Sequence, residues 1–403
     1  MTSQPVRSCP GAVVMGDLDL VAPLALAGIP VTVVAARDDP VRFSRRRLRR
    51  IEDNRPDTDR LVSRLRAHAR AQDRPPVLFY ESDEDLAFIL GHLDALRSDF
   101  RFVLGEPELV GILMDKARFQ QHAEQLGLPV PPAITIDTAT ATADLPSPTF
   151  PGIVKPMGLG RGWVPGSTFE GAKARLVRDR AELVETLQQA APHHRQLLFQ
   201  QFVPGPETRI ESYHAYVDTE GVVVAEFTGR KIRTHPSAFG FTTALTTTDA
   251  PDVRTLGRTV MATLGLCGVA KLDFKRDEAG RLWLLEVNPR FNLWHHVGAV
   301  AGCNLPALVY ADLTGAPRPQ VSTARAGATW CWLPRDALVA RTAAESRAAY
   351  LRWLRGCDAF AGAVPTDPWP FVRGRLWPLV RDHARPSAGG RAPVTVDRVA
   401  AGH

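Results

Sequence analysis

Two neighbouring apolar runs in the last third of the chain form its most informative hydrophobic pattern. The first is Lys271-Leu-Asp-Phe-Lys275 and the second is Arg281-Leu-Trp-Leu-Leu-Glu-Val-Asn-Pro-Arg290, and both are rich in residues that favour buried strands. Asp277-Glu-Ala-Gly280, which separates them, has the composition of a hairpin turn. The pattern therefore predicts a β-hairpin.

Polar side chains on this hairpin are spaced so that they share one face. Side chains alternate between the two faces of a strand, so Glu286 and Asn288 point the same way, as do Lys271 and Asp273. If the register aligns them, Asp273, Glu286 and Asn288 form an all-oxygen cluster, which suits Mg²⁺. The alternative is a solvated face, where carboxylates on strands more often lie. The flanking Leu-Trp-Leu-Leu run argues against that alternative.

Short apolar runs near the start predict a parallel sheet. Residues 12–15 and Val31-Thr-Val-Val34 are separated by a helical pattern, which is the order of a strand–helix–strand unit. Val77–Tyr80 is a further strand, and Ser82 is placed to cap the helix after it. No Gly-x-Gly-x-x-Gly motif follows the first strand, so the sequence gives little support to a dinucleotide site.

The middle of the chain alternates helices and strands around two candidate loops. Helices are predicted at 107–114, 116–126 and 252–265, and strands at 152–156, 196–203, 209–217 and 222–228. The glycine-rich segment 157–166 suits phosphate oxygens, although it has the composition of an ordinary mobile loop as well. Gly229-Arg-Lys-Ile-Arg-Thr-His-Pro236 is expected to be a basic loop that either recognises phosphate and carboxylate groups or is merely solvated.

Composition sets the broad class of the protein. With 403 residues and 45% hydrophobic content, the chain can bury the cores of two or three domains. It has no run of about 18 apolar residues, no secretion-signal pattern at its start, and five cysteines without Cys-x-x-Cys spacing. A cytoplasmic protein without a membrane span is therefore expected. The net charge of +6 is concentrated partly in residues 42–50, but no nucleic-acid-binding motif accompanies it, so specific nucleic-acid binding is not expected.

The hairpin residues resemble a known family. Asp273, followed by Glu286 and Asn288 within Glu-Val-Asn-Pro-Arg, is similar to the metal-binding signature of the ATP-grasp superfamily. The chain looks most like the carboxylate–amine ligases, among them the D-alanine–D-alanine and D-aspartate ligases, over roughly residues 11–315. The resemblance implies an α/β fold with α+β central lobes, in which a Rossmann-like domain precedes two lobes that clasp ATP.

The resemblance divides the chain into five segments. They are an N-terminal domain at 1–106, a small lobe with the glycine-rich loop at 107–195, a metal-binding lobe at 196–318, a C-terminal extension at 319–383 and a disordered tail at 384–403. Residues 321–378 hold five of the eight tryptophans and are expected to form an appended helical layer.

The resemblance also implies a nucleotide site. The residues that match the family's ATP-binding positions are Lys116, Lys155, Gly158, Gly160, Gln200, Gln201, Val203 and Glu207. Lys116 and Lys155 are expected to reach the phosphates, Gln201 and Val203 to meet adenine, and Glu207 to hold the ribose. Gln200 stands where the family often has glutamate, and the loop carries Arg161 and Trp163 where the family has mainly small residues.

The same resemblance implies metal and catalytic residues. Asp273, Glu286 and Asn288 are expected to hold two Mg²⁺ ions, with Mn²⁺ as an alternative. The cations expected to act on the reacting groups are Arg230, Lys231, Lys271 and Arg290, where Lys271 replaces an arginine common in relatives. Adjacent His295 and His296 point in different directions, which favours packing or pocket lining over catalysis.

The implied activity is an ATP-dependent ligation. A carboxylic acid would take the γ-phosphate of ATP to form an acyl phosphate, and an amine would then displace phosphate to form an amide. Amino acids are among the candidate acids and amines, and the family allows a homodimer. Two alternatives stay open, namely an ATP-binding regulatory or scaffold protein without catalysis and an ATP-grasp carboxylase or kinase.

Overall fold

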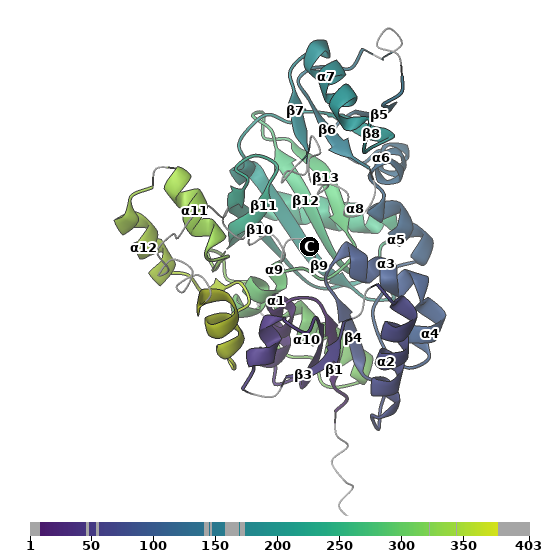
Figure 1. Ribbon diagram of the computed structural model, residues 1–403, viewed down its shortest axis with the longest axis vertical. Helices are drawn as coiled ribbons and strands as arrows, with labels where there is room; N and C mark the ends of the chain where they lie inside the picture. Colours follow the sequence, from purple (N-terminus) through teal and green to yellow (C-terminus); the bar gives the residue numbers. More distant parts are fainter. Residues whose placement is uncertain are drawn as a thin grey trace, which may run out of the picture. The chain divides into compact units, whose positions relative to one another are not determined.

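The computed structural model describes residues 9–45, 48–53, 56–140, 145, 147–157, 169, 174–321, 323–343 and 345–377. These residues form two compact units (Figure 1). The first unit contains the described residues up to 103 together with 290–321 and 361–377, and the second contains 104–289 and 323–360. Gly158, Gly160 and the tail at 384–403 lie outside the described residues, and the five segment boundaries expected from the sequence stay a prediction.

A parallel four-stranded sheet in the order β3-β2-β1-β4 is the centre of the first unit. This confirms the opening strand–helix–strand unit. The elements of the unit are β1 (Ala12–Met15), α1 (Leu18–Leu26), β2 (Val31–Ala35), η1 (Pro40–Phe43), β3 (Arg49–Glu52), α2 (Thr58–Arg70), β4 (Val77–Tyr80), α3 (Asp83–Gly91), α4 (Leu93–Arg97), α9 (Trp294–Val300), α10 (Leu305–Thr314) and η4 (Pro370–Leu376).

Side-chain caps fix where the helices that follow these strands begin. Ser82 accepts a hydrogen bond from the backbone N–H of Asp85, and the Asp85 carboxylate accepts one from the N–H of Ser82 at 3.0 Å, so the predicted cap is confirmed as a capping box. Asp17 caps α1, which begins shortly after β1.

Within the described residues, no single helix is long and apolar enough to cross a membrane. Helices α9 and α10, which are bent by 88° relative to each other, pass that test as a pair by length and composition.

The second unit is built on two sheets. One has seven strands in the order β13-β12-β9-β10-β11-β14-β15, and the other has four antiparallel strands in the order β5-β8-β6-β7. The elements are α5 (Pro107–Met114), α6 (Lys116–Gln125), β5 (Ala133–Asp137), β6 (Gly152–Pro156), β7 (Arg175–Val177), α7 (Arg180–Ala190), β8 (Gln196–Gln201), η3 (Glu207–Arg209), β9 (Ile210–Val217), β10 (Val223–His235), β11 (Phe241–Thr248), α8 (Pro251–Leu264), β12 (Gly268–Arg276), β13 (Leu282–Asn288), β14 (Thr329–Cys331), α11 (Arg335–Thr342), α12 (Arg347–Arg355) and β15 (Ala359–Phe360).

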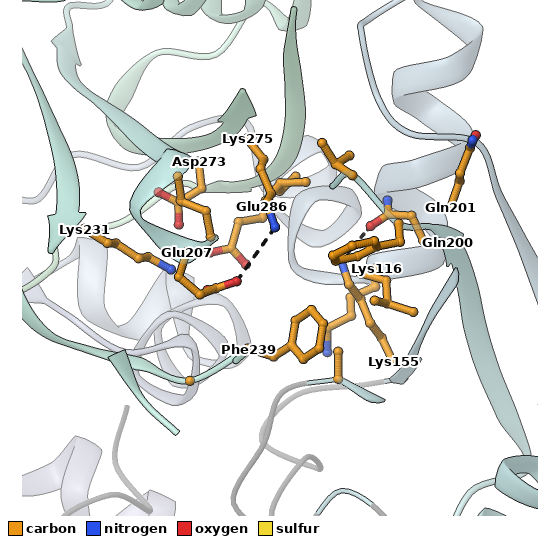
Figure 2. Close-up of a pocket in the computed structure, with 17 residues that line it drawn as sticks. Lys116, Lys155, Gln200, Gln201, Glu207, Lys231, Phe239, Asp273, Lys275 and Glu286 are labelled. Atoms are coloured by element: carbon orange, nitrogen blue, oxygen red, sulfur yellow. Dashed lines mark hydrogen bonds and ion pairs between the residues drawn. The ribbon is translucent and has the colours of Figure 1, made fainter. Parts of the chain in front are cut away.

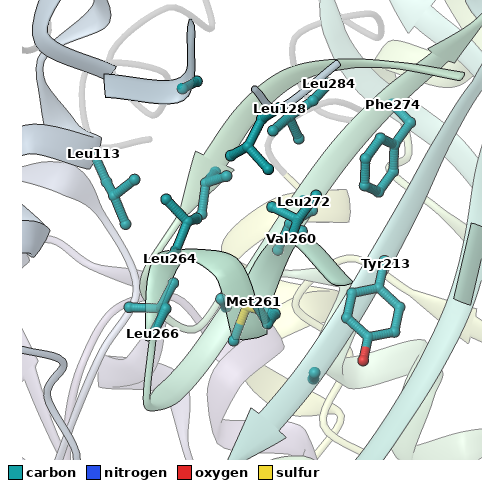
Figure 3. Packing of buried hydrophobic residues seen from close by; sticks show 14 of the residues in the cluster. Leu113, Leu128, Tyr213, Val260, Met261, Leu264, Leu266, Leu272, Phe274 and Leu284 are labelled. Carbon is teal, nitrogen blue, oxygen red and sulfur yellow. The ribbon is translucent and has the colours of Figure 1, made fainter. Parts of the chain in front are cut away.

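A core beneath the seven-stranded sheet holds the predicted hairpin in place. Leu272 and Phe274 of β12 and Leu284 of β13 belong to one buried cluster with Val260 and Met261 of α8 (Figure 3). These side chains occupy the apolar face of the hairpin, and the opposite face is therefore left for its polar residues.

Close approach of α8 to the sheet requires a glycine. A Cβ atom at Gly257 would lie 2.4 Å from the ring of Tyr213 on β9, so any larger residue would push the helix away. Helix α8 therefore supports the sheet from which the polar hairpin residues project. This amphipathic helix was predicted at 252–265 and runs from Pro251 to Leu264.

Two sequence expectations are wrong. The basic loop at 229–236 is the second half of strand β10, whose residues from Thr228 to His235 pair with β11. The expectation failed because the pairing partner, Phe241–Thr248, was not identified as a strand. The appended segment is not purely helical either, since β14 and β15 extend the seven-stranded sheet beyond β11.

Candidate nucleotide and metal site

The register of the β12–β13 hairpin aligns the predicted metal residues. Asp273 lies directly opposite Glu286, and Lys271 lies opposite Asn288. Directly opposed residues of an antiparallel pair share a face, so the two carboxylates and the amide form one group. The register therefore aligns Asp273, Glu286 and Asn288 as the predicted oxygen cluster requires.

The hairpin carboxylates are already engaged with positive and polar groups. Asp273 is only 3% exposed, and its Oδ2 accepts a hydrogen bond from the Lys271 ammonium at 2.6 Å. The Ser212 hydroxyl donates to the other oxygen of Asp273, and the Asn288 amide donates to Glu286 Oε1 at 3.2 Å. The oxygen donors of this group fit the ligand preference of Mg²⁺.

The candidate ligand set differs in composition from an all-carboxylate or histidine site. Among the residues that the structure describes, no group of three or more His, Cys, Asp or Glu side chains is arranged to hold a metal. Two carboxylates with one amide oxygen leave further coordination positions for water and phosphate oxygens. Mg²⁺ is usually bound in that way in nucleotide sites.

A pocket in the second unit adjoins the two carboxylates (Figure 2). It contains about 790 Å³ of empty space, part of it open to solvent. Its lining residues are Lys116, Ile153, Lys155, Ala174, Gln200, Gln201, Phe202, Val203, Glu207, Ile210, Lys231, Phe239, Gly240, Asp273, Lys275, Leu285 and Glu286. The structure therefore brings together residues from β6, β8, β10, β12 and β13, which are distant in the sequence.

Lysines supply most of the positive charge of this pocket. The Lys116 ammonium donates to the carbonyl oxygen of Pro156 at 3.0 Å, and the Lys155 ammonium donates to Gln200 Oε1 at 2.8 Å. Lys231 is 7% exposed, and within the described part of the chain its ammonium has no hydrogen bond or ion pair. A nearly buried ammonium without an anionic partner favours an anionic ligand at this position.

Lys275 also lines the pocket, although no role was predicted for it from the sequence. Its ammonium lies 3.9 Å from Glu207 Oε1 and 4.9 Å from the centre of the Phe202 ring. Burial lowers the pKa of Lys275 below its ordinary value, and the Glu207 carboxylate opposes that shift. Its position two residues after Asp273 was a usable signal, because strand periodicity places both on one side.

The remaining nucleotide-site residues form the less polar part of the lining. Gln201 ends β8, and Phe202 and Val203 follow it; the centroid of the Phe202 ring lies 6.4 Å from that of Phe239. The backbone N–H of Gln201 donates to the carbonyl oxygen of Pro132 at 2.8 Å, so it serves the fold. Gly240 allows the tight turn beside Phe239, since a Cβ atom there would lie 2.0 Å from the carbonyl oxygen of Pro236.

The four predicted catalytic cations occupy different environments. Lys231 lines the pocket, whereas its neighbour Arg230 is exposed on β10. Lys271 is held by Asp273, as described above. Arg290 belongs to the first unit, where its Nε donates to Asp83 Oδ1 at 2.5 Å and its Nη1 donates to the carbonyl oxygen of Glu81 at 2.6 Å. Their catalytic roles stay predictions.

The histidine pair lies in the interior of the first unit. His295 and His296 are both buried in α9, and the backbone N–H of Asn292 donates to His295 Nδ1 at 3.0 Å. Burial lowers the pKa of His295 to about 3, so its ring is neutral near pH 7. His296 Nδ1 lies 2.8 Å from Asp19 Oδ1. These contacts favour packing, which was one of the two roles, with pocket lining, that the sequence favoured over catalysis.

Comparison with solved structures identifies the fold of the chain. The chain superposes on an L-amino acid ligase from Bacillus licheniformis with a TM-score of 0.58 and 16% identity, covering 79% of this chain and 78% of that one. It superposes on a biotin carboxylase from Campylobacter jejuni with a TM-score of 0.59 and 15% identity, covering 80% of this chain and 74% of that one. These neighbours are ATP-grasp proteins, and this chain has the ATP-grasp fold, as the hairpin signature predicted.

Sequence relatives provide a second comparison. A D-alanine–D-alanine ligase from Pseudomonas entomophila (strain L48) is 29% identical over 224 residues, which cover 50% of this chain and 64% of that relative. One from Marinomonas sp. (strain MWYL1) is 26% identical over 265 residues, covering 59% of this chain and 78% of the relative. No family model matches the chain. The predicted resemblance to ATP-grasp carboxylate–amine ligases is confirmed by these relatives.

Proposed function

We propose that this protein is an ATP-dependent carboxylate–amine ligase that forms an amide or peptide bond and releases ADP and phosphate. The observation that carries the proposal is the pocket in which Asp273 and Glu286, paired across one hairpin, face Lys231 and the lysines of the opposite wall. Paired carboxylates beside several ammonium groups suit a nucleoside triphosphate that is transferring phosphate. The names of the sequence relatives support ligation as the use of that transfer.

Each part of the pocket has a task in this reaction. Lys116 and Lys155 hold phosphate oxygens from one wall, and Lys231 approaches from β10. Asp273, Glu286 and Asn288 would hold Mg²⁺, which neutralises phosphate charge when bound. Glu207, placed near Lys275, offers its carboxylate to the ribose hydroxyl groups.

The chemistry requires little of the protein beyond positioning and charge. A carboxylate oxygen of the acid attacks the γ-phosphorus and the bond to ADP breaks, which gives an acyl phosphate. The amine then attacks the acyl carbon, phosphate leaves with the former carboxylate oxygen, and the amine loses a proton. Ordered cations stabilise both steps without a covalent enzyme intermediate. No serine or cysteine nucleophile is needed for this reaction.

Several finer features belong to the same proposal. We expect two Mg²⁺ ions during turnover, with Mn²⁺ able to replace them, because two carboxylates and an amide leave room for phosphate oxygens. Small carboxylic acids and amines, including amino acids, are the proposed substrates. A homodimer in the cytoplasm is the proposed form of the enzyme.

Release of ADP and phosphate tests the function. The protein is incubated with ATP and Mg²⁺ and a panel of amino acids and small carboxylic acids, each offered alone and in pairs. ADP release that requires one acid together with one amine supports ligation and identifies both substrates. ATP binding without ADP release for any pair contradicts it and favours a regulatory protein, while ADP release that depends on bicarbonate favours a carboxylase.

A further inference from the structure

A chain of buried side-chain amides runs from the pocket into the small lobe. The Lys155 ammonium donates to Gln200 Oε1 at 2.8 Å, and Gln200 Nε2 donates to Gln120 Oε1 at 3.1 Å. Gln120 Nε2 in turn donates to Glu124 Oε1 at 2.7 Å and to the carbonyl oxygen of Pro131 at 2.9 Å. Gln200 is 2% exposed and Gln120 is 4% exposed, so both amides are removed from bulk water.

The chemistry of its two ends fixes the direction of this chain. An ammonium group only donates hydrogen bonds, whereas a carboxylate and a carbonyl oxygen only accept them. Lys155 therefore requires the oxygen of Gln200 on its side, and Glu124 with Pro131 requires the nitrogen of Gln120 on theirs. The network therefore assigns the orientation of both amides. If the oxygen and nitrogen of either amide exchanged places, two donors or two acceptors would meet at each of its contacts.

An amide at position 200 needs such an orienting partner, whereas a carboxylate would not. Both oxygens of a carboxylate accept hydrogen bonds, but a glutamine side chain presents an acceptor or a donor according to its rotation. Gln200 lines the pocket beside Ile153, Phe202 and Val203, the apolar part of the lining that suits a flat nucleobase. The group that Gln200 presents there decides which base edge it can meet.

We propose that Gln120 is a positioning residue that holds the Gln200 oxygen toward the pocket and thereby makes the site select adenine over guanine. This inference rests on the proposed ATP-binding function. Adenine carries an amino group at the position where guanine carries a carbonyl oxygen. An oriented acceptor pairs with the amino group and repels the carbonyl, so the discrimination depends on the acceptor that Gln120 offers to Gln200 Nε2.

Two substitutions at position 120 separate orientation from packing. Gln120→Leu removes the acceptor for Gln200 Nε2, so that once Lys155 turns from Gln200 to the phosphates, as proposed above, the Gln200 amide can rotate. Gln120→Glu retains an acceptor there, and its carboxyl group, buried beside the Glu124 carboxylate, is expected to stay protonated and to donate to Glu124. The double variant Gln120→Leu with Gln200→Glu places a carboxylate in the pocket, which accepts in either rotation and needs no partner.

The test measures the affinity of the full chain for ADP and for GDP by isothermal titration calorimetry with Mg²⁺. Gln120→Leu should reduce the preference for ADP about tenfold, the effect of one misplaced hydrogen bond. Gln120→Glu should keep the preference within about threefold, and Gln200→Glu should restore it in the leucine background. If Gln120→Leu does not fold, Gln120→Met fills the same space and takes its place.

An unchanged ADP preference in the leucine or methionine variant would overturn the positioning role, and so would equal binding of ADP and GDP by the unmodified protein. Either result leaves the proposed ligase function standing, because ADP still binds. Failure of the unmodified protein to bind either nucleotide would instead contradict the proposed function. Thermal unfolding midpoints of all variants show whether a change in preference follows from lost stability.

Discussion

Asp273 lies directly opposite Glu286 in the ladder between β12 and β13. The regular pairing extends from Lys271 to Asp273, and the register shifts only after Asp273. If the register had shifted one residue before Asp273, one of the two carboxylates would lie on the apolar face that packs on α8. The hairpin therefore joins the two acids at one end of the pocket.

Replacing Glu286 by glutamine should abolish turnover while the fold stays intact. The amide keeps the size of the side chain but removes the negative charge expected to help hold Mg²⁺ beside Asp273. We expect kcat for ADP release to fall by at least about a hundredfold. Circular dichroism should match that of the unmodified protein.

Glu278→Gln is the matched control for that variant. Glu278 lies in the exposed turn of the same hairpin, so the substitution makes the same chemical change away from the pocket. Its kcat should equal that of the unmodified protein. Retained turnover in Glu286→Gln would rule out the metal-binding role of the hairpin.

Lys231→Met should weaken ATP binding without destabilising the protein. Lys231 is nearly buried in the pocket wall, and among the described residues no acceptor satisfies its ammonium. Methionine removes the charge and its desolvation cost, so the melting temperature should stay the same or rise. The dissociation constant of ATP should increase about tenfold or more, the loss of one charge-assisted hydrogen bond. A destabilised Lys231→Met would show that Lys231 serves the fold, and an unchanged dissociation constant of ATP would contradict its role in phosphate binding.

Asp336→Asn should strongly destabilise the second unit. The Asp336 side chain is fully buried and accepts hydrogen bonds from Arg233 Nε at 2.8 Å, from Arg233 Nη2 at 2.7 Å and from the Thr243 hydroxyl at 2.9 Å. The substitution leaves the Arg233 charge without its buried partner, which costs about 3–5 kcal/mol. Urea unfolding measures the loss.

Glu345→Gln provides the comparison on the same arginine. Glu345 lies 3.1 Å from Arg233 Nη1, but its side chain is 34% exposed. Exposed ion pairs contribute about 1 kcal/mol or less, so this variant should remain close to the unmodified protein. Equal effects of the two variants would contradict a dominant role of the buried pair.

His295 should make the stability of the protein sensitive to mild acid. Burial lowers its pKa to about 3, whereas an unfolded histidine titrates near 6.5. Between these values the unfolded chain binds a proton that the folded chain does not, so stability falls as the pH falls. The contribution of His295 between pH 7 and pH 5 is about 2 kcal/mol.

His295→Asn isolates that contribution. Asparagine retains an acceptor for the backbone N–H of Asn292 but does not titrate. The variant should lose about 2 kcal/mol less stability between pH 7 and pH 5 than the unmodified protein, as measured by urea unfolding at both values. An identical loss in both proteins would show that folding does not lower the pKa of His295.

The sequence was sufficient where the signals are local. The β12–β13 hairpin, the Ser82 cap and helix α8 all follow from turn chemistry, capping residues and periodicity within about fifteen residues. The parallel opening of the chain follows in the same way. The residues expected to bind nucleotide were predicted through the family resemblance, and Lys116, Lys155, Gln200 and Glu207 do line one pocket.

Features that depend on distant partners were not predictable in this way. Residues 229–235 are strand because β11 pairs with them, and β14 reaches the same sheet only after about eighty further residues. The role of Gln120 depends on Gln200, which lies 80 residues away in the sequence. Side-chain networks of this kind require the tertiary structure, because no local pattern marks their members.

Transfer of ¹⁸O from a labelled carboxylic acid to inorganic phosphate tests the proposed acyl-phosphate reaction most directly. The acid found in the substrate panel is labelled in its carboxyl group and incubated with ATP, Mg²⁺ and the amine, and the released phosphate is analysed by mass spectrometry. The carboxylate oxygen that attacks the γ-phosphorus leaves with phosphate, so each phosphate should carry one ¹⁸O atom. Unlabelled phosphate formed together with the amide would contradict carboxylate activation by ATP at this site.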